Sequence, residues 1–292
     1  MPSVHHGGEI GGGTLFFFTI LLVLLALYLQ AAWRQGRIGR GWSAWRVSSF
    51  VTGIVLLGAA VTPALGSWAM HDLRGHMVQH LLLGMMVPLG LVLGAPGLLL
   101  LRTVPAATGR RIVRCLALRP VRGLIHPLTA LVLDVGVMYL LYLTPLYAWS
   151  LGNAALHHVI HLHFVIAGYL FTWSVIGLDP APHRPGPITR LAALFLATAT
   201  HATLGKLMYA YGYPRGTPHG PEEIQAAAQI MYYGGDLVEL GLIVVFFATW
   251  GRRPASPISG WISMRSSLRS RGSRNWASPR VMFAWPWRGW PR

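Results

Sequence analysis

Long apolar stretches separated by short polar segments dominate the chain from residue 14 to residue 250. A helix needs about 20 mostly apolar residues to cross the hydrocarbon core of a bilayer. Seven stretches reach this length: 14–33, 48–67, 76–101, 124–144, 155–176, 188–211 and 225–250. The pattern predicts an all-α, polytopic membrane protein that folds as a bundle of seven transmembrane helices.

Arginine alternates between the connections that this pattern leaves. The connections 34–47, 102–123 and 177–190 contain four, six and two arginines. The other connections contain Arg74, Arg215 or none. Because basic residues accumulate in cytoplasmic loops, the alternation predicts an external N-terminus and a cytoplasmic C-terminus.

Composition supports a membrane protein and argues against a nucleic-acid-binding one. The 292 residues are 53% hydrophobic and 11% charged, whereas soluble domains are about a quarter charged. The net charge of +16 comes with too much apolar sequence for a nucleic-acid-binding domain. We therefore expect no nucleic acid among the partners.

The predicted spans divide the chain into three parts. Residues 1–13 form an external segment, and residues 14–250 form the membrane domain. Residues 251–292 are rich in Arg, Ser, Trp and Pro, with nine arginines and no periodicity. Such a composition is typical of a disordered basic tail, which we expect to contact anionic lipids in the cytoplasm.

Cysteine contributes little to any site. Cys115 is the one cysteine in the sequence, so an intrachain disulfide is impossible and no Cys-x-x-Cys pair exists. Metal chemistry would therefore have to use histidine, methionine or carboxylates.

Histidines gather at the predicted outer ends of two spans. The segment HDLRGHMVQH precedes one apolar run, and ALHHVIHLHF opens another. His76 and His80 are four residues apart and share a helix face, and so do His157 and His161. Because ionisable groups in a membrane are costly and usually face a functional interior, two pairs at one depth predict a ligand site.

The neighbouring histidines are weaker candidates for ligands of this site. His158 and His163 point to other faces of the same helix, and His71 lies in a loop from which it could cap the site. Loop histidines such as His219 receive no role.

Other ionisable side chains also fall within predicted spans: Asp134, His201, Lys206, Asp236 and Glu239. Each alone is equally compatible with a structural hydrogen bond between helices. A metal-bound histidine usually donates its second N–H to a carboxylate or carbonyl, so we expect His201 and Asp236 to support the site. Asp236 is preferred to Glu239 because it lies nearer the outside. The alternative is a structural ion pair between Asp236 and Lys206.

The ligand chemistry favours copper. Imidazole binds copper, zinc, iron and nickel, and a thioether such as that of Met77 favours Cu(I). No HExxH motif of a zinc hydrolase is present. Haem is the alternative ligand, because inward histidines on separate helices can bind its iron. Pro88 predicts a kink in the helix that carries His76 and His80.

The stretch HMVQHLLLGMMVPLGLVLGAP, residues 76–96, resembles the signature of the CtaG/caa3-type cytochrome c oxidase assembly factors. The pattern of His157, His161 and the following residues to Trp173 is similar to the same family, and so is the Q…IMYYGG segment from Gln225. The resemblance covers about residues 14–250. Ile160 stands where the family often has an acid, and Tyr232 where it usually has tryptophan.

The resemblance implies a multi-pass protein of the bacterial inner (cytoplasmic) membrane. It implies assistance in building a haem–copper oxidase, with copper handling at subunit I, a possible copper donor protein and no catalytic turnover. His76, His80, His157 and His161 match the polar positions of the family. Two other functions stay open: a haem-bearing electron-transfer subunit, and a transporter of metal or protons. The apolar inner halves of the spans argue against the transporter.

Overall fold

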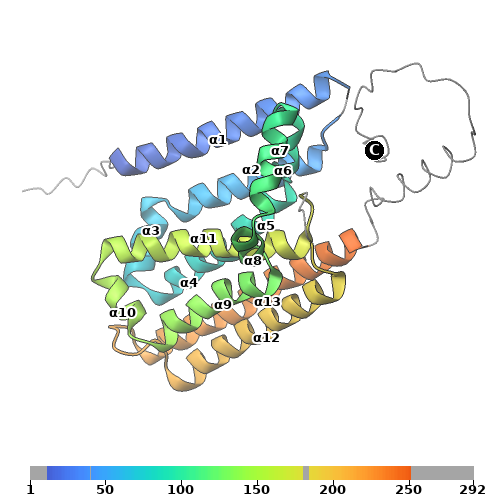
Figure 1. Ribbon diagram of the computed structural model, residues 1–292. Helices are drawn as coiled ribbons and strands as arrows, with labels where there is room; N and C mark the ends of the chain where they lie inside the picture. Colours follow the sequence, from blue (N-terminus) through green and yellow to red (C-terminus); the bar gives the residue numbers. More distant parts are fainter. Residues whose placement is uncertain (1–11, 40, 180–183, 251–292) are drawn as a thin grey trace, which may run out of the picture. The chain divides into compact units, whose positions relative to one another are not determined.

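A computed structural model describes residues 12–39, 41–179 and 184–250. Every regular element within these residues is helical, which confirms the all-α prediction. The elements are α1 (Gly12–Arg37), α2 (Ala44–Ala60), α3 (Pro63–His71), α4 (Leu73–Leu81), the π-helix η1 (Leu82–Met86), α5 (Val87–Leu93), α6 (Pro96–Thr103), α7 (Ala106–Leu116), α8 (Arg119–Leu124), α9 (Pro127–Leu143), α10 (Leu146–Leu151), α11 (Ala154–Ile176), α12 (Pro187–Tyr211) and α13 (Pro221–Trp250) (Figure 1). Most of the predicted external segment, and the basic tail after Trp250, lie outside the described residues.

Five helical stretches are long and apolar enough to cross a membrane: Gly12–Arg37, Leu73–Thr103, Ala154–Ile176, Pro187–Tyr211 and Pro221–Trp250. Helices α2 and α3 make a sixth span if the pair, bent by 56°, is counted as one. The chain is thus a multi-pass membrane protein with five or six candidate spans in the described residues. A seventh span would require α9, which is apolar but only 17 residues long. The count of seven and the external N-terminus stay predictions.

The stretch from Leu73 to Thr103 is not one continuous α-helix. Proline has no amide hydrogen, so Pro88 cannot donate to the carbonyl of Gly84, and the π-helical turn η1 lies directly before it. Ala95 has a left-handed backbone (φ 49°) just before Pro96, and there α5 gives way to α6. The α-helix is therefore interrupted next to Pro88, where a kink was predicted, and a second break lies toward the arginine-rich end.

Glycines let neighbouring helices approach this broken span closely. A Cβ on Gly168 of α11 would overlap the carbonyl oxygen of Gly84 in η1. On the opposite side, a Cβ on Gly90 would lie 2.9 Å from the Cα of Gly53 in α2. The π-helical turn is thus packed between two helices, and the backbone itself forms the contact surface.

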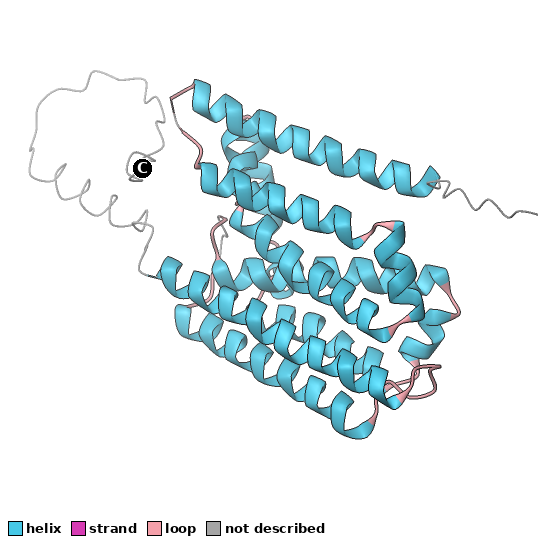
Figure 2. Cartoon of the chain, turned by 180° about the vertical axis from the view of Figure 1, so that it is seen from behind, coloured by secondary structure: helices cyan, strands magenta, loops and turns pink. Residues whose placement is uncertain are grey.

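The long helices surround this span. Helix α11 packs on α5, η1 and α9, and α9 packs on α12 (Figures 1 and 2). Helix α10 connects α9 to α11 at one end of the bundle, and Met77, Tyr142 and Phe164 belong to the large core between the helices. Helix α1 packs on α2 and α6 around a second, smaller core.

Candidate functional site

Three histidines from two helices meet near the α10 end of the bundle. The ring centroid of His76 on α4 lies 5.8 Å from that of His161 and 6.3 Å from that of His157, both on α11. The rings of His157 and His161 are 4.2 Å apart, and His76 is 1% exposed. The structure therefore brings together these three of the four predicted ligands, here called the outer cluster.

His80 lies one turn further along and faces a different partner. Its ring centroid is 6.3 Å from that of His201 on α12 and 4.6 Å from that of Phe164. Nδ1 of His201 lies 3.9 Å from Oε1 of Glu239 on α13, which is too long for a hydrogen bond. His80, His201 and Glu239 form the deep cluster.

A cavity of about 30 Å³ adjoins the deep cluster. His80, Asp134, His201 and Glu239 all contribute to its lining. This volume is enough for one or two water molecules or a small ion. Gly235 of α13 makes room for the imidazole of His201, because a Cβ at this position would overlap that ring.

Both clusters contain buried polar atoms without hydrogen-bond partners. Among the described residues these include six imidazole nitrogens on four histidines, His76, His80, His161 and His201, and Oε2 of Glu239. Most buried polar atoms in proteins are hydrogen-bonded, and leaving one unsatisfied costs about 1–3 kcal/mol. A concentration of such atoms at one place indicates a site that is completed by a ligand.

The second nitrogen of His76 is held by tyrosines. Its Nε2 lies 3.1 Å from the hydroxyl of Tyr142 on α9, and its ring packs edge-on at 4.8 Å from the ring of Tyr147 on α10. When Nε2–H donates to the tyrosine oxygen, Nδ1 carries the lone pair of the neutral ring and can coordinate a ligand. The tyrosines thus orient His76 so that its Nδ1 is the unpartnered atom.

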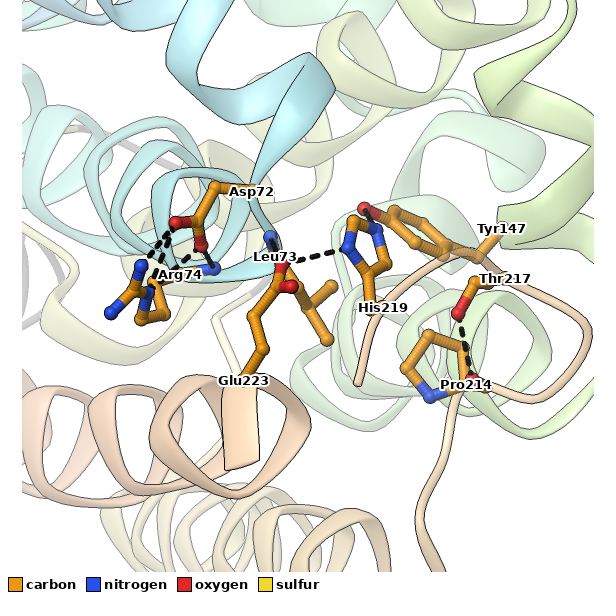
Figure 3. Close-up of polar contacts among 8 residues, drawn as sticks. All are labelled: Asp72, Leu73, Arg74, Tyr147, Pro214, Thr217, His219 and Glu223. Atoms are coloured by element: carbon orange, nitrogen blue, oxygen red, sulfur yellow. Dashed lines mark hydrogen bonds and ion pairs between the residues drawn. The ribbon is translucent and has the colours of Figure 1, made fainter. Parts of the chain in front are cut away.

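A hydrogen-bonded chain leads from Tyr147 to the start of α13. The hydroxyl of Tyr147 lies 3.4 Å from Nε2 of His219, and Nδ1 of His219 lies 2.7 Å from Oε1 of Glu223 (Figure 3). The same oxygen accepts a hydrogen bond of 2.6 Å from the amide of Leu73, at the start of α4. We call Tyr147, His219 and Glu223 the outer network. It connects α4, α10 and α13 beside the outer cluster.

The sequence reasoning assigned no role to His219, because the residue lies in a loop. The structure buries it and gives both ring nitrogens a partner. The spacing of four residues between His219 and Glu223, just before a long helix, was the available signal.

Asp72 begins α4 at the same end of the bundle. Its carboxylate accepts a hydrogen bond of 2.8 Å from the amide of Arg74 and pairs with the guanidinium of the same residue (Figure 3). The Arg74 guanidinium lowers the pKa of Asp72 to about 2. Burial raises the pKa of Tyr147 above its ordinary range, so its hydroxyl is neutral and able to donate.

The predicted supporting residues fall in different places. Met77 is completely buried in the core, and Asp134 lines the cavity of the deep cluster. Glu239 is the acid beside His201, whereas Asp236 is half-buried and lines a separate cleft between α12 and α13. The supporting role of Asp236 stays a prediction.

The alternative pairing of Asp236 with Lys206 does not form among the described residues. The Lys206 side chain is exposed, and its ammonium lies 5.4 Å from the ring centroid of Tyr232. The remaining candidates bond to backbone carbonyls: His71 to Ser67, His158 to Ala154 and His163 to Leu133.

The clusters fit a ligand that accepts imidazole nitrogens from several helices. In the described part of the chain, no three His, Cys, Asp or Glu side chains converge closely enough to hold a metal ion as they are placed. The ring centroids of His76 and His161 lie 5.8 Å apart. A metal about 2 Å from two imidazole nitrogens leaves the ring centres up to about 6 Å apart.

Comparison with known proteins gives relatives without an assigned activity. An uncharacterized protein of Mycobacterium leprae is 32% identical over 191 residues, which are 63% of this chain and 29% of that protein. Uncharacterized proteins of Mycobacterium bovis and Mycobacterium tuberculosis are 35% identical over 204 residues, 66% of this chain and 31% of theirs. The chain thus spans about three tenths of the length of these relatives. No solved structure matches it.

The family described as cytochrome c oxidase caa3 assembly factor matches residues 26–253. The match includes every helix that contributes to the two clusters and most of the described chain. The match agrees with the resemblance of residues 76–96 and covers more than half of the sequence. The chain belongs to the caa3-type cytochrome c oxidase assembly factor family.

Proposed function

We propose that this protein binds copper in its two histidine clusters and presents it to a haem–copper oxidase during assembly. The six buried imidazole nitrogens without partners carry the proposal. Neutral imidazole is a good ligand for copper in either oxidation state, whereas a structural role would leave these nitrogens hydrogen-bonded. The protein acts as a carrier, with copper as its cargo, and performs no catalytic turnover.

The order of the clusters suggests a path for the cargo. The outer cluster lies beside the outer network at the α10 end of the bundle, so it receives the metal first. His80 follows His76 by one helical turn and faces His201. The deep cluster is therefore the second position. Copper reaches it without leaving the interior of the bundle.

The predicted orientation agrees with this path. With seven spans and an external N-terminus, the arginine-rich connections lie in the cytoplasm. The outer cluster then faces the outside of the inner membrane, where a copper donor protein supplies the metal and where the cargo passes to subunit I.

Cavity size supports copper over haem. Pockets for ligands of the size of a drug or cofactor are on the order of 300 Å³ or more. The cavity beside His80 and His201 is about 30 Å³, so it accommodates an ion far more readily than a porphyrin. A haem between these rings would require the helices to separate.

Copper titration of the purified protein under reducing conditions tests the proposal. We expect His76→Ala and His161→Ala to lower the affinity for Cu(I) by at least about tenfold, as removal of a ligand does. The matched control is His163→Ala, on the same helix as His161, which bonds to a backbone carbonyl outside the clusters. Bound metal should dissociate below about pH 6, because protonated imidazole cannot coordinate.

A variant in which all four predicted ligands are replaced tests whether they bind copper: His76, His80, His157 and His161. If it folds and binds copper with wild-type stoichiometry, the site is elsewhere. An absorption spectrum of the protein purified from cells separates the alternatives, because haem would show a Soret band and copper alone would not.

A further inference from the structure

A cleft of about 470 Å³ opens between α12 and α13 at the surface of the bundle. Thr198 and Ala199 contribute from α12, and Tyr232, Asp236 and Glu239 contribute from α13. The rim is apolar, since Phe195 and Leu240 are strongly exposed there. The floor contains two carboxylates.

These carboxylates have no cation close to them among the described residues. Oε2 of Glu239 is buried without a hydrogen-bond partner, and neither Asp236 nor Glu239 forms an ion pair with Lys206. His201 is the nearest basic group, at 3.9 Å from Glu239. Acidic side chains inside a membrane are costly and are usually paired. Among the described residues no lysine or arginine forms an ion pair with either carboxylate, so the cleft has the charge complement of a cationic side chain.

Glu239 also connects the cleft to the deep cluster. Its side chain lines both the cleft and the cavity that His80 and His201 share. The cavity and the cleft thus share this carboxylate in their linings. A group that enters the cleft and binds Glu239 comes within one side chain of the deep histidines.

We propose that this cleft is the docking site for a transmembrane helix of a partner protein that carries a lysine or arginine at the middle of the bilayer. The basic side chain pairs with Asp236 and Glu239, and the apolar rim packs against the rest of the helix. The proposal rests on the proposed function only for the identity of the partner as the recipient of copper. Docking itself requires no metal.

The experiment uses the full chain in lipid nanodiscs, without copper, and two synthetic helices. Both are Leu/Ala peptides of about 20 residues, one with a central lysine and the other with a central norleucine. A photo-crosslinking residue replaces Ala199 in the cleft wall or, as a control, Val55, which is exposed on α2. We expect the lysine peptide to label the Ala199 position about tenfold more than the norleucine peptide, and the Val55 position to label both equally.

Substitutions of the two carboxylates test whether they bind the lysine of the peptide. Asp236→Asn and Glu239→Gln should each reduce labelling by the lysine peptide toward the level of the norleucine peptide. Glu222→Gln is the matched control, because Glu222 is exposed in the first turn of the same helix and outside the cleft. It should leave labelling unchanged.

Three results would overturn the proposal. Equal labelling by the two peptides would show that charge does not direct docking. Adducts between two copies of the chain that exclude the lysine peptide would show that the cleft is a homodimer interface. Adducts with lipid alone would show that no helix binds. Because the assay contains no copper, none of these results affects the copper titration, and a negative copper titration would not affect this proposal.

Discussion

Two groups of buried polar residues differ in their hydrogen bonding: Asp179 and Tyr28 beside α6, and the histidines of the two clusters. Asp179 is 3% exposed, and its carboxylate accepts hydrogen bonds from the amides of Gly97 and Leu98. Nearby, the hydroxyl of Tyr28 donates to the carbonyl of Gly94 at 2.7 Å. In the histidine clusters, by contrast, buried nitrogens have no partner.

This difference distinguishes polar groups that stabilise the fold from polar groups that are available to bind a ligand. A satisfied buried group contributes about 0.5–1.5 kcal/mol to stability, whereas an unsatisfied one lowers it. Proteins keep unsatisfied groups at functional sites at the expense of stability. Replacing a buried polar residue by an apolar one should therefore have opposite effects on stability in the two groups.

The largest effect is expected where both clusters depend on one backbone contact. Gly168→Ala would place a Cβ on the carbonyl of Gly84 and force α11 away from η1, so we expect the free energy of unfolding to fall by about 3 kcal/mol or more. Gly66→Ala is the control, because nothing lies within 4 Å of a Cβ there. Thermal denaturation in detergent measures both. A Gly168→Ala protein as stable as the Gly66→Ala protein would mean that this close contact does not hold the clusters together.

The next effect concerns Asp179, whose carboxylate is hydrogen-bonded. Asp179→Leu removes the acceptor for two amides in the first turn of α6, so we expect a loss of about 1–3 kcal/mol with unchanged affinity for copper. Denaturation and copper titration on the same preparation check both parts. Weakened copper binding at full stability would contradict the division between the two groups.

The third effect has the opposite sign. His80→Leu removes two unpartnered nitrogens from the interior, so we expect the protein to gain about 1 kcal/mol of stability while its affinity for copper falls. His163→Leu is the control, since its Nε2 lies 2.9 Å from the carbonyl of Leu133, and it should be destabilising. The comparison between the two groups fails if both substitutions destabilise the protein equally.

The helices were largely predictable from the sequence, and their breaks less so. The lengths of the apolar stretches located the long spans, and Pro88 predicted the interruption of the α-helix next to it. The arginine-rich connection 102–123 was read as a loop, yet it contains the helices α7 and α8. The arginines of this segment predicted that it lies outside the membrane. Charged residues do not prevent a helix from forming at a surface. The predicted span 124–144 corresponds to α9, which begins at Pro127 and ends at Leu143, before Pro145, so it is shorter than the prediction.

The sequence predicted which histidines share a helix face where their spacing fixes it, and the binding role of these residues stays a prediction. A spacing of four residues placed His76 and His80 on one face, and likewise His157 and His161. The rotation of α13 could not be derived in this way. Asp236 and Glu239 are three residues apart, so they differ by about 60° around the helix, and depth alone could not decide which one faces His201. Rotation follows from close packing, here from Gly235 against the His201 ring.

The smallest expected effect lies in the outer network, whose polar groups are satisfied although they adjoin the unsatisfied outer cluster. Glu223 is partly exposed, so its bond to His219 should contribute only about 0.5–1 kcal/mol. A double-mutant cycle with Glu223→Gln and His219→Gln measures this coupling by denaturation. Because His219 contacts Tyr147, and Tyr147 packs on His76, the same variants should weaken copper binding by a few fold without abolishing it. A coupling of zero together with unchanged copper affinity would show that the network is independent of both the fold and the site.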